Sequence, residues 1–404
     1  MSLTKMCFLV SLVSAATGMA CAQGTAYVAF NSAAQTIMGF GGSTAWMPEL
    51  TTGQANALFG NSNPTEMGLT ILRVRIDPGG QSNWSTELSN AQQAKALGAF
   101  TIATPWTPPA SMKSNNNTVG GTLNTSEYAA YASYLNSFSS YFYSNGVSLY
   151  AISMQNEPDA SVDYESCSWT GSTMDTWVAN NASVLYTPLM MPESESFTTS
   201  YSDPTLDDSN AVGHVTYVAG HLYGTSPSYY TNAFNHGKQV WMTEHYLSGT
   251  GISETMAVAK EINDSMSIGN YSAYLWWWLA DWPAESYTNG LIDTNNNLTQ
   301  NGVAVAQYSK FVRTGYQRAN STYNPSSGVY VTAYMGSGHY VIVALNTGSS
   351  AVSQPFSLSG ATVTSFTPYQ TDSSENIAQL NVVPVSNNAF TFTLPAQSIT
   401  TFVH

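Results

Sequence analysis

Charged residues are few in this chain of 404 residues. Only 8% are Asp, Glu, Lys or Arg, against roughly 25% in an ordinary soluble domain. The 10 basic residues are outnumbered by 24 acidic ones, which gives a net charge of −14. A protein of this charge repels phosphate backbones, so we expect no nucleic acid partner. Its polar surface must consist mainly of neutral hydroxyl and amide side chains, which suit a neutral, hydroxyl-rich ligand.

Metal-ligand motifs and long apolar runs are also lacking. The 6 histidines show no HxxxH or HExxH spacing, so the sequence predicts no metal site. We expect no organic cofactor either. No apolar run approaches the roughly 18 residues that a membrane-spanning helix requires. Hydrophobic residues nevertheless make up 43% of the chain, which is ample for a large core.

The N-terminus has the pattern of a secretory signal peptide covering residues 1–22. Lys5 precedes a short apolar stretch at 7–13, and Ala20-Cys21-Ala22 fits the small-x-small cleavage pattern. A lipid anchor on Cys21 is the alternative. We therefore expect a secreted protein, extracellular or periplasmic, that has no membrane contact after cleavage and works as a monomer.

Cleavage after Ala22 would leave Cys167 as the single cysteine. No internal disulfide could then form, and stability must come from packing. A packed thiol in a loop is the favoured interpretation of Cys167, and a catalytic thiol is the alternative.

From residue 37 to 315 the chain alternates short β-rich runs with longer helical stretches, among them 127–143 and 253–266. Eight β-strands with crossovers predict a (β/α)8 TIM barrel, whose sites lie at the C-terminal ends of the strands. The expected strands are 37–42, 70–77, 100–106, 148–155, 188–192, 215–223, 239–243 and 273–279.

After residue 316 the pattern changes to short alternating runs separated by turns rich in Gly, Ser and Asn. Such runs predict an antiparallel β domain, a side β-sandwich of residues 316–404 attached to the barrel. Residues 23–36 contain one more strand, at 26–30, that we expect to join this domain before the chain enters the barrel.

Two carboxylates follow two of the predicted barrel strands. The fourth strand ends on Asn156-Glu157-Pro158, and the seventh runs through Trp241-Met242-Thr243 to Glu244. Glycosidic bond hydrolysis needs such a pair, one proton donor and one nucleophile or base. For Glu157 the alternative is a capping or surface carboxylate. A donor at Glu157 requires a raised pKa, whereas Glu244 must be ionised.

Aromatic and cationic residues follow other strands. Trp46 and Trp106 could each present an indole face to a sugar ring, with core packing as the alternative. Arg73 could hold a carboxylate nucleophile ionised or form a structural pair with Asp77, and the latter interpretation is favoured for Arg75.

The sixth strand ends on His221 and Tyr223, which share one side of a strand and can both face the site, although a structural histidine is the alternative. Trp276, Trp277 and Trp278 end the eighth strand. Because side chains alternate along a strand, only some of the three can contact a ligand. We expect Trp277 to do so.

The chain resembles glycoside hydrolase family 30, in particular the branch of bacterial glucuronoxylanases and related xylanases. The resemblance lies in FGGSTAWMPELT, ILRVRID, ATPWTPP, YAISMQNEPD, MPES, VWMTEHY, AYLWWW, YSKFVRTGY and LPAQSITTFV, which run from residue 39 to 403. It implies a barrel with a side β domain and a retaining mechanism. It further implies that Glu157 is the acid/base, Glu244 the nucleophile and Asn156 the amide that binds the sugar 2-hydroxyl. We also expect Tyr246, two residues after Glu244, to bind the substrate.

One departure bears on specificity. The glucuronoxylanases carry an Ile-Arg-Arg-Ser-Tyr-Gly stretch after the last strand, and one of its arginines binds the glucuronate branch. Here residues 279–284 read Leu-Ala-Asp-Trp-Pro-Ala, with Asp281 in that region. We therefore expect hydrolysis of β-linked xylan or xylooligosaccharides without dependence on glucuronate. The alternatives are another activity of the family, a β-1,6-galactanase or β-glucosidase type, and a non-catalytic carbohydrate-binding protein.

Overall fold

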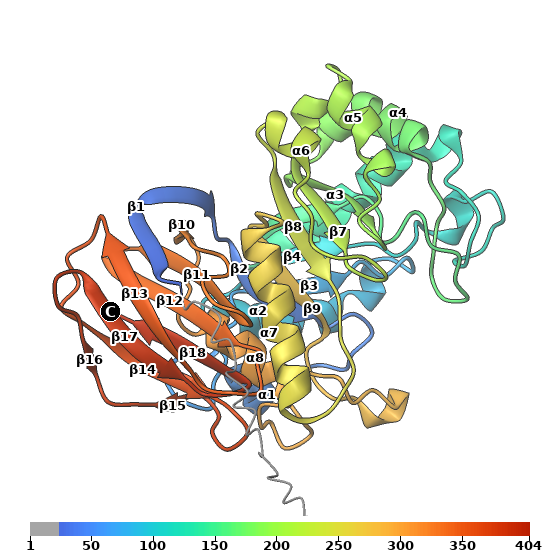
Figure 1. The fold of residues 1–404 in the computed structure, drawn as a ribbon. Coiled ribbons are helices and arrows are strands. Elements are labelled where there is room, and N and C mark those ends of the chain that lie inside the picture. The colour runs from blue at the N-terminus through green and yellow to red at the C-terminus, as the bar shows by residue number, and fades with distance from the viewer. Residues whose placement is uncertain (1–23) are drawn as a thin grey trace, which may run out of the picture.

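The computed structural model describes residues 24–404 and contains a barrel and a separate β domain (Figure 1). The signal peptide expected at residues 1–22 lies outside the described residues. In the described part of the chain, no helix is both long and apolar enough to cross a membrane.

Eight parallel strands close into the barrel in the order in which they occur in the chain. All eight strands expected from the sequence are present, and the (β/α)8 prediction is confirmed. They are β2 (Gly39–Ser43), β3 (Ile71–Arg75), β4 (Phe100–Thr104), β5 (Leu149–Ser153), β6 (Leu189–Ser194), β7 (Val215–His221), β8 (Gln239–Glu244) and β9 (Ala273–Trp278).

The lower half of the barrel is filled by apolar side chains that alternate along the strands. Ile71, Ile102, Tyr217, Ala219 and Trp241 belong to one buried cluster there. Because side chains two residues apart share a face, the next inward positions toward the C-terminal ends lie directly above this apolar layer.

Helices cover the outside of the barrel, and side chains begin several of them. Thr51 and Thr170 form capping boxes with the third residue of their helices, and Thr299 caps a third helix. The helices are α1 (Thr52–Phe59), α2 (Ser85–Ala96), α3 (Tyr128–Ser144), α4 (Gly171–Asn181), α5 (Asp203–Asp207), α6 (Thr231–Asn235), α7 (Gly251–Ser267) and α8 (Gln300–Ser309). The two crossover helices predicted from the sequence correspond to α3 and α7.

The β domain is built on a ten-stranded, mostly antiparallel sheet. Its strands are β1 (Ala26–Thr36), β10 (Gln317–Ser321), β11 (Val329–Gly336), β12 (His339–Asn346), β13 (Val352–Ser359), β14 (Ser365–Thr371), β15 (Ala378–Gln379), β16 (Val383–Pro384), β17 (Ala389–Leu394) and β18 (Ser398–Val403). The strand β1 comes from the N-terminal end of the described chain. It pairs antiparallel with β10 and parallel with β13, and in Figure 1 it lies in blue beside the orange strands.

The β domain packs against the barrel through the side where α7 and α8 lie (Figure 1). Tyr334, Val343 and Ile399 of the sheet belong to the same buried cluster as the barrel helices. Gln307 of α8 donates to Thr371 at 2.8 Å and accepts from Thr401 at 2.6 Å. This contact between the sheet and the barrel helices is apolar and hydrogen-bonded. It lies away from the C-terminal strand ends that carry the site.

Candidate active site

A polar layer lies above the apolar filling of the barrel. Arg73 follows Ile71 by two residues on β3, Thr104 follows Ile102 on β4, and His221 follows Ala219 on β7. Strand alternation therefore turns all three inward. Each of these side chains is fully buried, so this layer interacts with the groups around it and not with bulk water.

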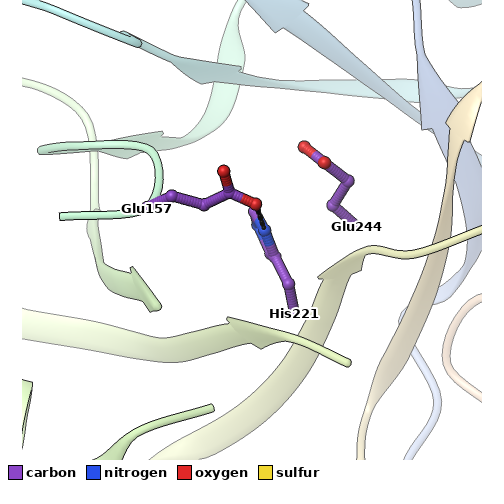
Figure 2. A group of neighbouring side chains, drawn as sticks. All are labelled: Glu157, His221 and Glu244. Atoms are coloured by element: carbon purple, nitrogen blue, oxygen red, sulfur yellow. Dashed lines mark hydrogen bonds and ion pairs between the residues drawn. The ribbon is translucent and has the colours of Figure 1, made fainter. Parts of the chain in front are cut away.

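The two predicted carboxylates sit on top of this layer. Glu244 is the last residue of β8, and Glu157 follows β5 in a left-handed backbone conformation with φ 42°. The Glu157 N–H donates to the carbonyl of Glu193 at 2.9 Å, which fixes its backbone. Figure 2 shows both carboxyl groups facing the same space, with His221 joined to Glu157. A carboxylate oxygen of each glutamate and a His221 ring nitrogen lie within 4.8 Å of one another.

Glu244 accepts hydrogen bonds on both oxygens. Arg73 Nη1 donates to its Oε2 at 2.6 Å, and the Tyr223 hydroxyl donates to its Oε1 at 2.9 Å. Burial raises the pKa of Glu244, and the charge of Glu157 adds to this, whereas His221 and Arg73 oppose it. The two donors favour the anionic form that a nucleophile needs.

Glu157 is bound by one residue from below and one from the cleft. Its Oε1 lies 2.9 Å from His221 Nδ1, and the Tyr164 hydroxyl donates to its Oε2 at 3.2 Å. Burial alone would lower the pKa of His221, but the carboxylates of Glu244, Glu157 and Glu193 raise it to about 9. His221 is therefore an imidazolium at neutral pH.

The positive charge of His221 changes the expectation for Glu157. Burial favours the neutral form of Glu157, yet the hydrogen bond and charge of His221 outweigh burial and hold the pKa of Glu157 below its usual value in the free protein. The raised pKa expected from the sequence is thus not present before substrate binds. The pattern of residues could not reveal that a protonated histidine lies beneath this carboxylate.

Above the carboxylates lies a cleft of about 600 Å³ with mainly aromatic walls. Trp46, Trp106 and Trp277 contact one another edge to face or tilted, with ring centroids 4.8–6.2 Å apart. The lining residues are Trp46, Trp106, Glu157, Tyr164, Glu195, Tyr223, Glu244, Tyr246, Trp277, Trp278, Trp282 and Glu285. Flat aromatic faces around two carboxylates suit the apolar C–H faces of sugar rings.

Among the predicted binding residues, Trp46, Trp106, Tyr223, Tyr246 and Trp277 line the cleft. Three others lie below it. Arg73 and His221 are fully buried, and Asn156 is 3% exposed. Arg73 and His221 therefore contact the carboxylates and not a ligand, because both are fully buried and neither lines the cleft. Asn156 Oδ1 accepts from Arg73 Nη2 at 2.7 Å.

The structural interpretations of Arg75 and Cys167 from the sequence are confirmed. Arg75 pairs with Asp77 at 2.7 Å, and it also pairs with Glu165 of the loop after β5. Cys167 is buried, and burial raises the pKa of its thiol to about 11. A buried thiol of this pKa stays protonated and is a poor nucleophile.

The tryptophans at the end of β9 depart from strict alternation. Gly42 pairs with Trp276, but the next residue, Ser43, pairs with Trp278, so Trp277 forms a bulge. Trp276 is buried and donates to the carbonyl of Asn289 at 2.7 Å. The bulge allows the neighbours Trp277 and Trp278 both to line the cleft. Simple alternation along the strand predicted that these two side chains would point in opposite directions.

Sequence reasoning missed several residues of the site, of which Glu193 is the most buried. It lies near the end of β6 within the MPES motif, and a carboxylate at a strand end is the same signal that identified Glu157 and Glu244. The predicted strand ended at Pro192, two residues before the observed end of β6 at Ser194, and so left Glu193 out. Tyr164 lies on a loop and Glu285 ends a short 3-10 helix, Pro283–Glu285, and no periodic pattern indicates the direction of either side chain.

Glu157, His221 and Glu244 have the spacing of a metal-ligand group, the one such group found in residues 24–404. Their surroundings oppose a divalent cation. The Arg73 guanidinium already binds Glu244 at 2.6 Å, and His221 Nδ1 is engaged by Glu157. Two positive charges in a buried site disfavour a third.

Comparison with known families gives two matches along the chain. The glycosyl hydrolase family 30 TIM-barrel domain matches residues 82–273, and the glycosyl hydrolase family 30 beta sandwich domain matches residues 315–402.

Individual proteins resemble the chain over nearly its whole length. The glucuronoxylanase XynC of Bacillus subtilis is 37% identical over 385 residues, which cover 91% of this chain and 89% of that protein. The structure of the family 30 subfamily 8 xylanase Xyn30A from Clostridium acetobutylicum has a TM-score of 0.88 and 42% identity, and covers 94% of this chain and 99% of its own. A family 30 endoxylanase from Clostridium papyrosolvens has a TM-score of 0.86 and 40% identity over the same shares.

Proposed function

The chain belongs to glycosyl hydrolase family 30, and on this premise we propose that it hydrolyses β-linked xylan or xylooligosaccharides with retention of configuration. The observation that carries the proposal is a pair of carboxylates beneath an aromatic cleft, with one oxygen of each within 4.8 Å of the other. Retaining enzymes hold their two carboxyl groups about 5–5.5 Å apart, whereas inverting enzymes need about 6.5–9.5 Å to admit a water molecule.

In the first step Glu244 attacks the anomeric carbon and Glu157 protonates the departing glycosidic oxygen. The bond to that oxygen breaks as the bond to the Glu244 carboxylate forms. Arg73 and Tyr223 hold the Glu244 carboxylate, leaving its orientation fixed before substrate arrives. A neutral sugar over Glu157 excludes water from it, which favours the protonated form that the donor needs.

In the second step Glu157, now ionised, removes a proton from water as the water attacks the anomeric carbon. The glycosyl–Glu244 bond breaks, and the sugar leaves with its original configuration. His221 and Tyr164 hold the two oxygens of Glu157 in both steps, so one carboxyl group can act as acid and then as base.

The charge of the cleft supports a neutral substrate chain. Its lining contains Glu195 and Glu285 in addition to the two central carboxylates, and no Lys or Arg among the lining residues. Asp281 is not among the lining residues, and its Oδ1 accepts from the Gly290 N–H at 2.9 Å. The acidic residue of this segment that lines the cleft is therefore Glu285, and not the Asp281 expected from the sequence. Like charges repel, so we propose that cleavage does not depend on glucuronate.

Two experiments test these proposals separately. The Glu244→Ala variant should lose turnover and regain it with azide as a β-configured glycosyl azide, whereas an α product would mean inversion and overturn the assignment. Product analysis should show cleavage of linear xylooligosaccharides as well as glucuronoxylan. Cleavage only at a fixed offset from glucuronate would refute branch independence and leave the hydrolytic roles intact.

We also propose that the chain is exported and that residues 1–22 are removed. The low content of charged residues, 8% of the chain, and a polymeric substrate both support an extracytoplasmic location. N-terminal sequencing of protein recovered outside the cytoplasm should begin at or next to Gln23. Recovery of only full-length chain in the cytoplasm would contradict export.

A further inference from the structure

A third carboxylate lies beneath the two proposed catalytic ones. Glu193 is fully buried, and its backbone has φ 54°, a left-handed conformation that is uncommon outside glycine. Neither the attack on the sugar nor the proton transfer uses this residue. A buried carboxylate in a left-handed backbone conformation at the mouth of a barrel therefore indicates a separate functional role.

Glu193 contacts both buried cations of the site. Its Oε1 lies 3.1 Å from Arg73 Nη2 and 3.8 Å from His221 Nε2. Its Oε2 accepts from the Thr104 hydroxyl at 2.9 Å. Arg73 in turn reaches Glu244, and His221 reaches Glu157. Each cation thus bridges Glu193 to one member of the catalytic pair.

The charges of this cluster determine how many protons it holds. Arg73 and His221 supply two positive charges, and the three carboxylates supply three negative charges when all are ionised. A buried cluster favours neutrality because uncompensated charge is costly away from water. With Glu193 present, neutrality is reached when the catalytic pair carries one proton. Without Glu193, the cluster would be neutral with Glu157 and Glu244 both ionised and no proton to donate.

We propose that Glu193 is a positioning residue that keeps one proton on the pair formed by Glu157 and Glu244, by balancing the second buried cation. This inference rests on the hydrolytic function proposed above. The low pKa of Glu193, about 2, agrees with it: burial alone would raise that pKa, but Arg73 and His221 outweigh burial. Glu193 itself therefore stays ionised while the pair above it titrates.

The test is the pH dependence of kcat/KM for Glu193→Gln, which keeps the shape of the side chain and removes its charge. The pH profile of a reaction that needs one protonated and one ionised carboxyl is bell-shaped. We expect the alkaline limb of this profile, measured on xylan, to move to lower pH by roughly one unit or more. At neutral pH kcat/KM on xylan should fall at least about tenfold and recover as the pH is lowered. An aryl glycoside with a good leaving group needs no proton donor and should lose much less.

Two matched variants separate charge from structure. Glu193→Asp keeps the charge, so its alkaline limb should stay where it is in the wild type even if the rate falls. Glu254→Gln removes another buried carboxyl, on α7, and should move neither limb. An equal loss for Glu193→Gln on both substrates at every pH, with limbs unmoved, would reduce Glu193 to a structural residue and overturn the proposal.

Unmodified protein provides a second readout in case Glu193→Gln does not fold. The cluster requires His221 to be protonated together with one catalytic carboxyl, so an NMR titration should place the His221 midpoint near 9. A midpoint near the usual value of about 6.5 would overturn the inference. If the wild type shows no hydrolysis of any β-xyloside, the proposed function itself fails, which is a distinct result.

Discussion

The hydroxyl of Tyr223 offers a selective perturbation of the proposed nucleophile. It donates to Glu244 Oε1 at 2.9 Å, while Arg73 binds the other oxygen. The Tyr223 ring also contacts His245, with centroids 4.9 Å apart. Tyr223→Phe therefore removes one hydrogen bond to the carboxylate and leaves the aromatic packing in place.

The size of the effect follows from the charge on the acceptor. A hydrogen bond to a charged group is worth about 1.5–3 kcal/mol, and one pKa unit corresponds to about 1.36 kcal/mol. Because the bond favours ionised Glu244, its loss should raise the pKa of Glu244 by roughly one to two units. Burial already raises this pKa, and the variant adds to that shift. The acidic limb of activity should therefore move to higher pH by the same amount.

The assay is the pH profile of kcat/KM on a xylooligosaccharide. Tyr246→Phe is the matched control, because Tyr246 lines the same cleft and contacts the Tyr223 ring, whereas its hydroxyl makes no hydrogen bond to either central carboxylate within the described chain. Its acidic limb should stay at the wild-type position. A Tyr223→Phe limb that stays in place or moves to lower pH would refute the view that this hydroxyl stabilises the anionic nucleophile.

Three further predictions concern other groups of the site. His221→Asn removes a charge that lowers the pKa of both catalytic carboxyls, so both limbs should move to higher pH, and unmoved limbs would contradict the ion pair. The folded pKa of His221, about 9, exceeds its unfolded value of about 6.5. Its stabilisation is thus present below pH 6.5 and lost as the pH rises through 9, and the wild-type Tm should fall over this window more than that of His221→Asn. Glu285→Lys should raise kcat/KM on glucuronoxylan relative to linear xylan several-fold at low salt. Added salt should remove this advantage. An unchanged ratio would place Glu285 away from the branch.

Hydrophobic patterning was sufficient to predict the barrel, because buried parallel strands are apolar along their length and the helices between them are long. The same pattern located Glu157 and Glu244, since each follows such a run directly. Arg73 was predicted to hold the nucleophile or to pair with Asp77, and it lies 2.6 Å from Glu244. The position of a residue along a strand was therefore enough to predict that these side chains lie at the site.

The remaining residues depend on departures from regular strands. Glu193 projects inward from the irregular end of β6, and the bulge at Trp277 turns two neighbouring tryptophans toward the cleft. Tyr164 reaches Glu157 from a loop that Arg75 ties to the barrel through Glu165. Such contacts are set by tertiary packing between distant segments, and no local periodicity in the sequence records them. The proton balance of the site depends on the same contacts.

The arrangement of the cleft separates the chemistry from the recognition of branches. Arg73 on β3 binds Glu244, and Glu193 on β6 contacts Arg73 and His221; both residues are fully buried, so they depend little on surface loops. Trp282 and Glu285 instead lie on a turn closed by its own bonds: Trp282 N–H donates to the Tyr287 carbonyl at 2.9 Å, and Asp281 accepts from Gly290. A loop that satisfies its own backbone can change in sequence without disturbing the charges beneath it. Substitutions in this turn are therefore expected to alter which xylan is cut while the positions of both pH limbs stay fixed.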